Sequence, residues 1–118
     1  MSDKPKITDS HCHLDFPDFN DDRSEVINNA LQNGVCRMVT ICTRLKNEPL
    51  VRKISEDHKA VYYAAGNHPM SVSSEPMANF NELISLSEHP KFIAIGETGL
   101  DYYYTSETAE AQKKSLEI

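Results

Sequence analysis

Apolar residues in this chain form two kinds of pattern that alternate from end to end. Short, mostly apolar runs bounded by turn residues predict strands, at 7–13, 35–42, 61–65 and 92–95. Apolar residues at helical spacing predict helices that alternate with them, at about 22–33, from 47 onward, at about 76–88 and at 107–118. The strands start about thirty residues apart, which is typical of strand–helix units with right-handed crossovers. We therefore expect an α/β fold with a parallel sheet.

The expected helices carry local start and stop signals. Asp22 and Glu25 have the spacing of a capping box, Gly34 is a stop signal, and Pro49 lies in a first turn. The helix residues that we expect to face the core are Val26, Ile27, Ala30, Leu31, Leu50, Val51, Ile54, Met77, Phe80, Leu83 and Ile84. We interpret this apolar set as core and not as a binding surface.

Polar side chains gather where the expected strands end. Side chains alternate in direction along a strand, so His11 and His13 project to the same side and could hold one cation. His68 lies just past the third strand, and Glu97 lies at the end of the fourth. By itself a His-x-His pair is more often a surface or core pair, because two ligands are too few for a closed site. Parallel strands, however, place their carboxyl ends on one rim, which favours a metal site.

Several acidic residues follow the first histidine pair. We interpret them as loop and helix-start residues rather than ligands, because carboxylates favour the amino-terminal end of a helix. They are Asp15, Asp18, Asp21, Asp22 and Glu25. Asp9 is in phase with the two histidines and is expected to be a buried hydrogen-bonding partner.

Composition limits the function further. The 118 residues fit one domain, and a net charge of −6 opposes tight non-specific binding to nucleic acid. Bound divalent cations could reverse the field of an acidic pocket toward a phosphate. No apolar run suits a signal peptide or a membrane span, so a cytoplasmic protein without membrane contact is expected. Cys12, Cys36 and Cys42 lack C-x-x-C spacing and are expected to be reduced, semi-buried strand residues.

Three sequence blocks resemble, in order and spacing, the first three signature blocks of the TatD-like metal-dependent deoxyribonucleases. The blocks are Asp9-Ser10-His11-Cys12-His13-Leu14-Asp15, Gly66-Asn67-His68-Pro69 and Ile95-Gly96-Glu97-Thr98-Gly99-Leu100-Asp101-Tyr102-Tyr103. The resemblance covers nearly the whole chain. It implies a TIM-like (β/α) barrel, of which this chain supplies about four strand–helix units, and hydrolysis of DNA phosphodiester bonds by metal-activated water.

The same resemblance implies roles for individual residues. His11 and His13 would hold one metal, and Glu97 would ligate or bridge both of two divalent ions, Mg²⁺ or Mn²⁺ with Zn²⁺ as a third candidate. His68 would serve catalysis at the pocket for substrate phosphate or water. Asp101 would lie behind the ligands on the substrate side.

Length departs from the family pattern. A complete eight-stranded barrel needs about 250 residues, so residues 1–118 are expected to be one domain that forms the amino-terminal half. The later family blocks, with two histidines and an aspartate, are absent, and the first and fourth strands would be open edges. We therefore expect a weak or inactive enzyme that pairs with a complementary carboxyl-terminal half or associates with itself. A truncated or split gene product, or a fragment of a longer protein, would have the same length, and the expected helix at 107–118, which has no stop signal, favours truncation.

Two other functions stay open. Amidohydrolase-type barrels also begin with a His-x-His strand, and many use a carboxylated lysine at the end of strand four. Here Glu97 holds that position, while Lys91 precedes the strand. The second alternative is a non-catalytic assembly module whose exposed sheet recruits a partner.

Overall fold

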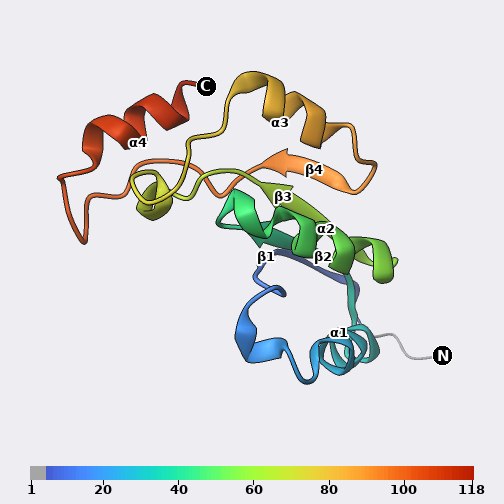
Figure 1. Cartoon of the computed structure of the whole chain (residues 1–118). Coiled ribbons are helices and arrows are strands. Elements are labelled where there is room, and N and C mark those ends of the chain that lie inside the picture. The colour runs from blue at the N-terminus through green and yellow to red at the C-terminus, as the bar shows by residue number, and fades with distance from the viewer. Residues whose placement is uncertain (1–4) are drawn as a thin grey trace.

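Four parallel strands form the single sheet of the computed structural model, which describes residues 5–118 (Figure 1). The order in the sheet is the order in the sequence: β1 (Ile7–Cys12), β2 (Val35–Cys42), β3 (Val61–Ala65) and β4 (Phe92–Ile95). Each neighbouring pair is parallel, as the spacing of the strands predicted. The prediction of a parallel α/β sheet is confirmed.

Four helices alternate with the strands. They are α1 (Arg23–Gln32), α2 (Glu48–Asp57), α3 (Phe80–Ser87) and α4 (Ala109–Leu116). Short 3-10 turns, η1 (Pro17–Phe19), η2 (Leu45–Asn47) and η3 (Pro69–Ser71), lie after the carboxyl ends of the first three strands. Helix α1 packs on β2, α2 packs on β2 and β3, and α3 packs on β4 (Figure 1). None of the helices in the described part of the chain is long and apolar enough to cross a membrane.

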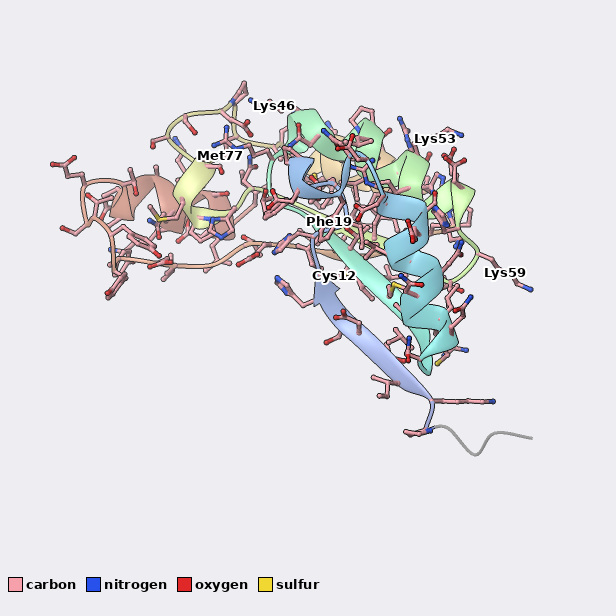
Figure 2. The ribbon with its side chains drawn as sticks, turned by 90° about the horizontal axis from the view of Figure 1, so that it is seen from below. Cys12, Phe19, Lys46, Lys53, Lys59 and Met77 are labelled. Atoms are coloured by element: carbon pink, nitrogen blue, oxygen red, sulfur yellow. The ribbon has the colours of Figure 1, made fainter. Side chains whose placement is uncertain are left out.

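The core lies under the two central strands. Its first cluster consists of Leu14, Ile27, Met38, Ile54 and Val61, and its second consists of Cys42, Val51, Tyr63 and Ala65. These side chains are buried because β2 and β3 are paired on both sides and covered by α1 and α2. Strands β1 and β4 are instead the edges of the sheet, and Figure 2 shows β1 extending outward with Cys12 at its carboxyl end.

Four of the residues expected in the core are exposed. They are Leu31, Leu50, Phe80 and Ile84. Phe80 and Ile84 lie on the first two turns of α3, next to β4, where no further strand is paired. Helical spacing identified the apolar face of α3 correctly only for Leu83, because burial also requires a neighbour on that side.

The start of α3 and the capping of α1 differ from the predictions. Helix α3 begins at Phe80 rather than near residue 76, because the Asn79 side chain accepts a hydrogen bond from the Glu82 backbone N–H at 2.9 Å. No side-chain cap forms at Asp22, whose backbone carbonyl accepts from the Val26 N–H instead. The predicted capping box at Asp22 is therefore wrong, although the helix that follows it is present.

The three cysteines are free, and their surroundings differ. Cys42 is buried and Cys12 is half-buried, and burial raises the pKa of both thiols to about 12. Cys36, near the amino end of β2, is exposed. The expectation of semi-buried strand residues is thus wrong for Cys36, which is exposed although its neighbour Val35 packs against the first core cluster.

Candidate metal centre

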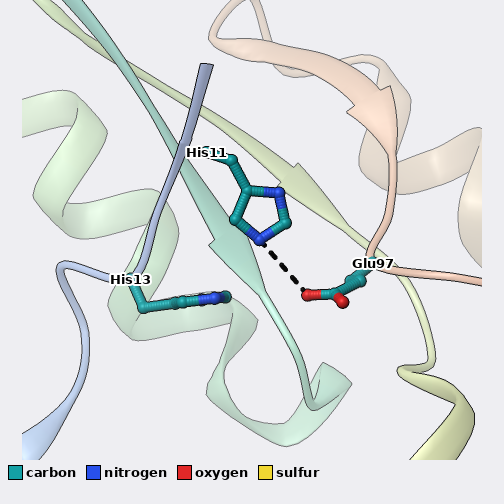
Figure 3. A group of neighbouring side chains, drawn as sticks. All are labelled: His11, His13 and Glu97. Carbon is teal, nitrogen blue, oxygen red and sulfur yellow. Dashed lines mark ion pairs between the residues drawn. The ribbon is translucent and has the colours of Figure 1, made fainter. Parts of the chain in front are cut away.

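Three metal-ligating side chains converge at the carboxyl end of the sheet (Figure 3). His11 lies in β1, His13 follows it, and Glu97 comes two residues after β4. One ligating atom from each of the three lies within 4.8 Å of the others. His11 Nε2 and Glu97 Oε2 are 3.4 Å apart. The alternation of side chains along an extended strand places both imidazoles on one side, facing the carboxylate from the opposite edge of the sheet.

The His13 ring is held in one orientation. Its Nδ1 is 3.1 Å from the backbone carbonyl oxygen of Ile41, and a carbonyl only accepts, so Nδ1 carries the hydrogen and donates. The ring also stacks on Phe16, with centroids 4.7 Å apart and planes 9° from parallel. The free lone pair therefore belongs to Nε2, which is the arrangement that supports a metal-binding imidazole.

His68 contacts the same carboxylate from another side. The Met70 backbone N–H donates to His68 Nδ1 at 3.0 Å, so the hydrogen of the neutral ring is on Nε2. This Nε2 lies 3.2 Å from Glu97 Oε1, to which it donates. The structure thus brings His68 to the predicted site, but as a donor to Glu97 with no lone pair directed at the ligands.

Asp101 does not join the cluster of ligating atoms. Its Oδ1 accepts from the Tyr103 backbone N–H at 3.0 Å, within the loop between β4 and α4. The buried side chain of Gln112 holds the Asp101 backbone, accepting from its N–H at 2.7 Å and donating to its carbonyl at 2.9 Å. In this structure Asp101 shapes the loop that follows Glu97.

Two acidic residues close to the histidines in sequence, Asp9 and Asp15, are at least partly buried. Asp9 is half-buried, and its Oδ1 accepts from the His11 backbone N–H at 3.1 Å, which is the expected kind of role. Asp15 lies in the turn after β1, as a loop residue, but only 6% of it is exposed, and this burial raises the pKa of its carboxyl. Asp15 Oδ1 has no hydrogen-bond partner among the described residues. The other acids interpreted as loop and helix-start residues, Asp18, Asp21, Asp22 and Glu25, are exposed.

Residues without chemical function also position the site. A Cβ on Gly66 would lie 3.2 Å from the backbone nitrogen of Gly96, and the Gly96 N–H donates to the Ala65 carbonyl at 3.1 Å. This close approach of the two chain segments sets Glu97 beside the end of β3. Thr40, fully buried, accepts from the Leu14 N–H at 3.0 Å and so ties the chain after His13 to β2. The sequence shows Gly66 two residues before His68, but it does not show that Gly66 lies against Gly96.

The donor set suits one divalent cation. Two imidazole nitrogens and one carboxylate oxygen are ligands that Zn²⁺ and Mn²⁺ accept readily, whereas Mg²⁺ prefers oxygen. Three protein ligands leave coordination positions open for water and substrate, as in catalytic sites. Within residues 5–118 no second group of three His, Cys, Asp or Glu side chains comes together. The described residues therefore supply one group of metal-ligating side chains.

Comparisons with known proteins agree with this geometry. Residues 8–118 match the family described as TatD related DNase. An uncharacterized metal-dependent hydrolase of Buchnera aphidicola is 34% identical over 116 residues, which cover 91% of this chain and 44% of that protein. A protein of Shigella flexneri named 3′-5′ ssDNA/RNA exonuclease TatD is 29% identical over 108 residues, covering 92% and 42%.

A solved structure gives the corresponding spatial match. The crystal structure of YjjV from Escherichia coli, a TatD homologue, superposes with a TM-score of 0.83 at 30% identity. The superposition covers 94% of this chain and 44% of YjjV. The predicted fold class is confirmed, and the chain spans less than half the length of the relatives that it matches.

Proposed function

Because this chain belongs to the TatD related DNase family, we propose that it supplies the first half of a metal-dependent site that hydrolyses DNA phosphodiester bonds. The convergence of His11, His13 and Glu97 carries this proposal, since three ligating side chains with open positions are typical of catalytic metal sites. The name of the Shigella relative supports a nucleic acid substrate. The family match favours this function over the amidohydrolase alternative.

The side chains of the site have separate tasks in this proposal. His11 and His13 bind the ion, and the Ile41 carbonyl keeps His13 in the tautomer whose Nε2 is free. Glu97 binds through its carboxylate, which His68 orients by donating to Oε1. A divalent ion, when bound, acts as a Lewis acid on a phosphate oxygen and lowers the pKa of water. We assign two ions to the complete site, as the family resemblance implies.

The proposal includes a structural partner. Strand β4 exposes Ile93 and Ile95 over 53% and 54% of their surfaces, and β1 exposes Ile7. Exposed apolar residues on two edge strands, each paired on one side only, favour association with another polypeptide segment. The unmatched part of YjjV supports the remaining half of a barrel as the partner, rather than a second copy of this chain. We expect residues 1–118 alone to hydrolyse DNA weakly or not at all.

Hydrolysis of a 3′-labelled single-stranded DNA tests the function. The complete protein that carries this chain is stripped of metal with a chelator and assayed with Mg²⁺, Mn²⁺ or Zn²⁺ added back. We expect cleavage only with metal, and rates near background for His11→Ala and Glu97→Ala. Glu110→Ala, which removes a largely exposed carboxylate of α4, is the matched control. Unchanged rates in both site variants would contradict the assignment.

The same assay tests the partner. Residues 1–118 are assayed alone at two concentrations. They are also assayed together with a separately expressed carboxyl-terminal half of a barrel from the same family. Activity that appears only in the mixture supports a complementary half. Activity that rises steeply with the concentration of this chain alone would instead indicate self-association.

A further inference from the structure

We propose that Tyr103 and Tyr104 form a platform on which nucleobases of a single-stranded nucleic acid stack while its backbone is held at the metal centre. This inference rests on the proposed function and specifies the form of the substrate. The roles proposed for the metal ligands and for His68 do not involve the aromatic rings of the loop between β4 and α4.

The first observation is the exposure of the two rings. Tyr103 is 87% exposed and Tyr104 is 73% exposed, whereas the preceding Tyr102 is 44% exposed. The Tyr103 and Tyr104 rings lie edge to face, with centroids 5.0 Å apart and planes at 85°. Single exposed apolar side chains are ordinary, but two adjacent aromatic rings that are both largely exposed and lie against each other form a small patch of the kind that marks binding surfaces.

The second observation is the position of the loop. Residues 96–108 connect the carboxyl end of β4 to α4, and the first turn of this connection carries Glu97. Tyr103 is six residues further along the chain, so its backbone lies at most about 22 Å from that of Glu97, since an extended residue spans at most about 3.6 Å. A strand of a few nucleotides bound at the metal centre can therefore reach the tyrosines.

The third observation is that hydrogen bonds fix the loop backbone. Gln112, which is fully buried in α4, bonds both the N–H and the carbonyl of Asp101. The Asp101 carboxylate then accepts from the Tyr103 N–H, and Thr105 Oγ1 accepts from the Glu107 N–H. A loop already ordered on both sides of the tyrosines loses less conformational freedom when it binds a ligand.

The chemistry of the pair favours bases over other groups. Every nucleobase offers a π-face, and stacking on an aromatic side chain is tolerant of sequence. In a duplex the bases stack on one another and only the terminal pairs offer a free face, so the platform selects single strands or unpaired ends. The chain has a net charge of −6, which opposes tight binding to nucleic acid through its phosphates alone. Stacking would supply the missing affinity.

Three substrates test the platform in the complete, metal-loaded protein. They are a single-stranded DNA, the same DNA with abasic sites in place of its three 3′ nucleotides, and a strand of the same length that is abasic throughout and so offers no aromatic ring. For Tyr103→Ala and Tyr104→Ala we expect kcat/KM on the first substrate to fall about 5- to 100-fold, mainly through KM. We expect changes within about twofold on the other two substrates.

Two sets of variants serve as controls. Tyr103→Phe and Tyr104→Phe keep the π-face and should retain most of the activity on single-stranded DNA. Phe80→Ala removes an aromatic ring of α3 that is 62% exposed and should leave all three rates unchanged. A loss in the alanine variants that is equal on all three substrates would overturn the platform and indicate that the rings pack against the rest of the barrel, and no loss at all would also overturn it.

A binding measurement separates this inference from the proposed function. If the complete protein hydrolyses no DNA, fluorescence anisotropy of a labelled single strand still compares wild type, alanine and phenylalanine variants. Weaker binding in the alanine variants alone would keep the platform while the nuclease assignment fails. Equal binding in all variants would overturn the platform, whatever the result of the activity assay.

Discussion

The centre and the edges of the sheet differ in burial and in chemistry. Strand β3 is buried along most of its length and β2 along most of its carboxyl-terminal half, whereas the residues of β1 and β4 are all exposed or half-buried. The ligating side chains nevertheless come from the edges, His11 from β1, His13 from the residue just after it, and Glu97 from the turn after β4. The strands that contribute most to the core are therefore not the strands that position the candidate metal ligands.

The edges are tied to the centre where the ligands lie. At β1, His13 donates to the Ile41 carbonyl and the Leu14 N–H donates to Thr40. At β4, the Gly96 N–H donates to the Ala65 carbonyl. Each tie lies at the carboxyl end of its strand. The edges are thus fixed at the rim that carries the site, even where their outer faces are uncovered.

Truncation of a central residue should have the largest effect. Ile54 in α2 is almost fully buried against β2 and β3, so Ile54→Ala should lower the free energy of unfolding by about 2–5 kcal/mol in urea denaturation of the complete protein. If the remainder of the barrel covers β4, Ile93→Ala should cost a comparable amount there. A cost for Ile93→Ala within about 0.5 kcal/mol, as for a surface residue, would argue against closure over β4.

A substitution that separates the segments just after β3 and β4, at Gly66 and Gly96, should chiefly affect catalysis. A methyl group at Gly66 would lie 3.2–3.3 Å from Gly96 backbone atoms, so Gly66→Ala should push Glu97 away from the histidines. We expect kcat to fall by clearly less than about 100-fold, because a displacement near 1 Å has an effect of that order and relief of this contact needs a smaller shift. At Gly96 an added methyl group meets nothing within 4 Å, so Gly96→Ala should cost less than Gly66→Ala. Equal rates for Gly66→Ala and wild type would show that Glu97 is not positioned by this approach.

Removing the His68 donor should have a smaller effect, on metal affinity. His68→Ala leaves Glu97 Oε1 without its 3.2 Å partner, and loss of such an orienting contact weakens metal binding by about 10- to 100-fold. Titration calorimetry with Mn²⁺ or Zn²⁺ measures the change, and His68→Gln, which keeps an N–H donor, should recover part of it. His89→Ala breaks a similar pair, with Glu56 at 3.1 Å, away from the site and should leave metal affinity as in wild type.

Local patterns in the sequence were sufficient to predict the four strands and to place the candidate ligands at the carboxyl ends of the strands. The four strands and their parallel order follow from short apolar runs about thirty residues apart, and strand alternation alone placed His11 and His13 on one side. Asn79 replaced the expected helix start near Pro76, because a cap depends on a single hydrogen bond that periodicity does not encode. The burial of Asp15 and the approach of Gly66 to Gly96 depend on contacts between distant segments, which no window of sequence contains.

The three free thiols differ enough to make one of them a selective attachment point. Cys12 and Cys42, with pKa values of about 12, stay protonated at pH 8, and a maleimide reacts with the thiolate. Cys36 is exposed at the amino end of β2, the end of the sheet opposite to the metal ligands. A fluorophore coupled to this chain without any mutation should therefore attach at Cys36, and it would report docking at the β1 edge through its emission while leaving the chemistry at the other end undisturbed.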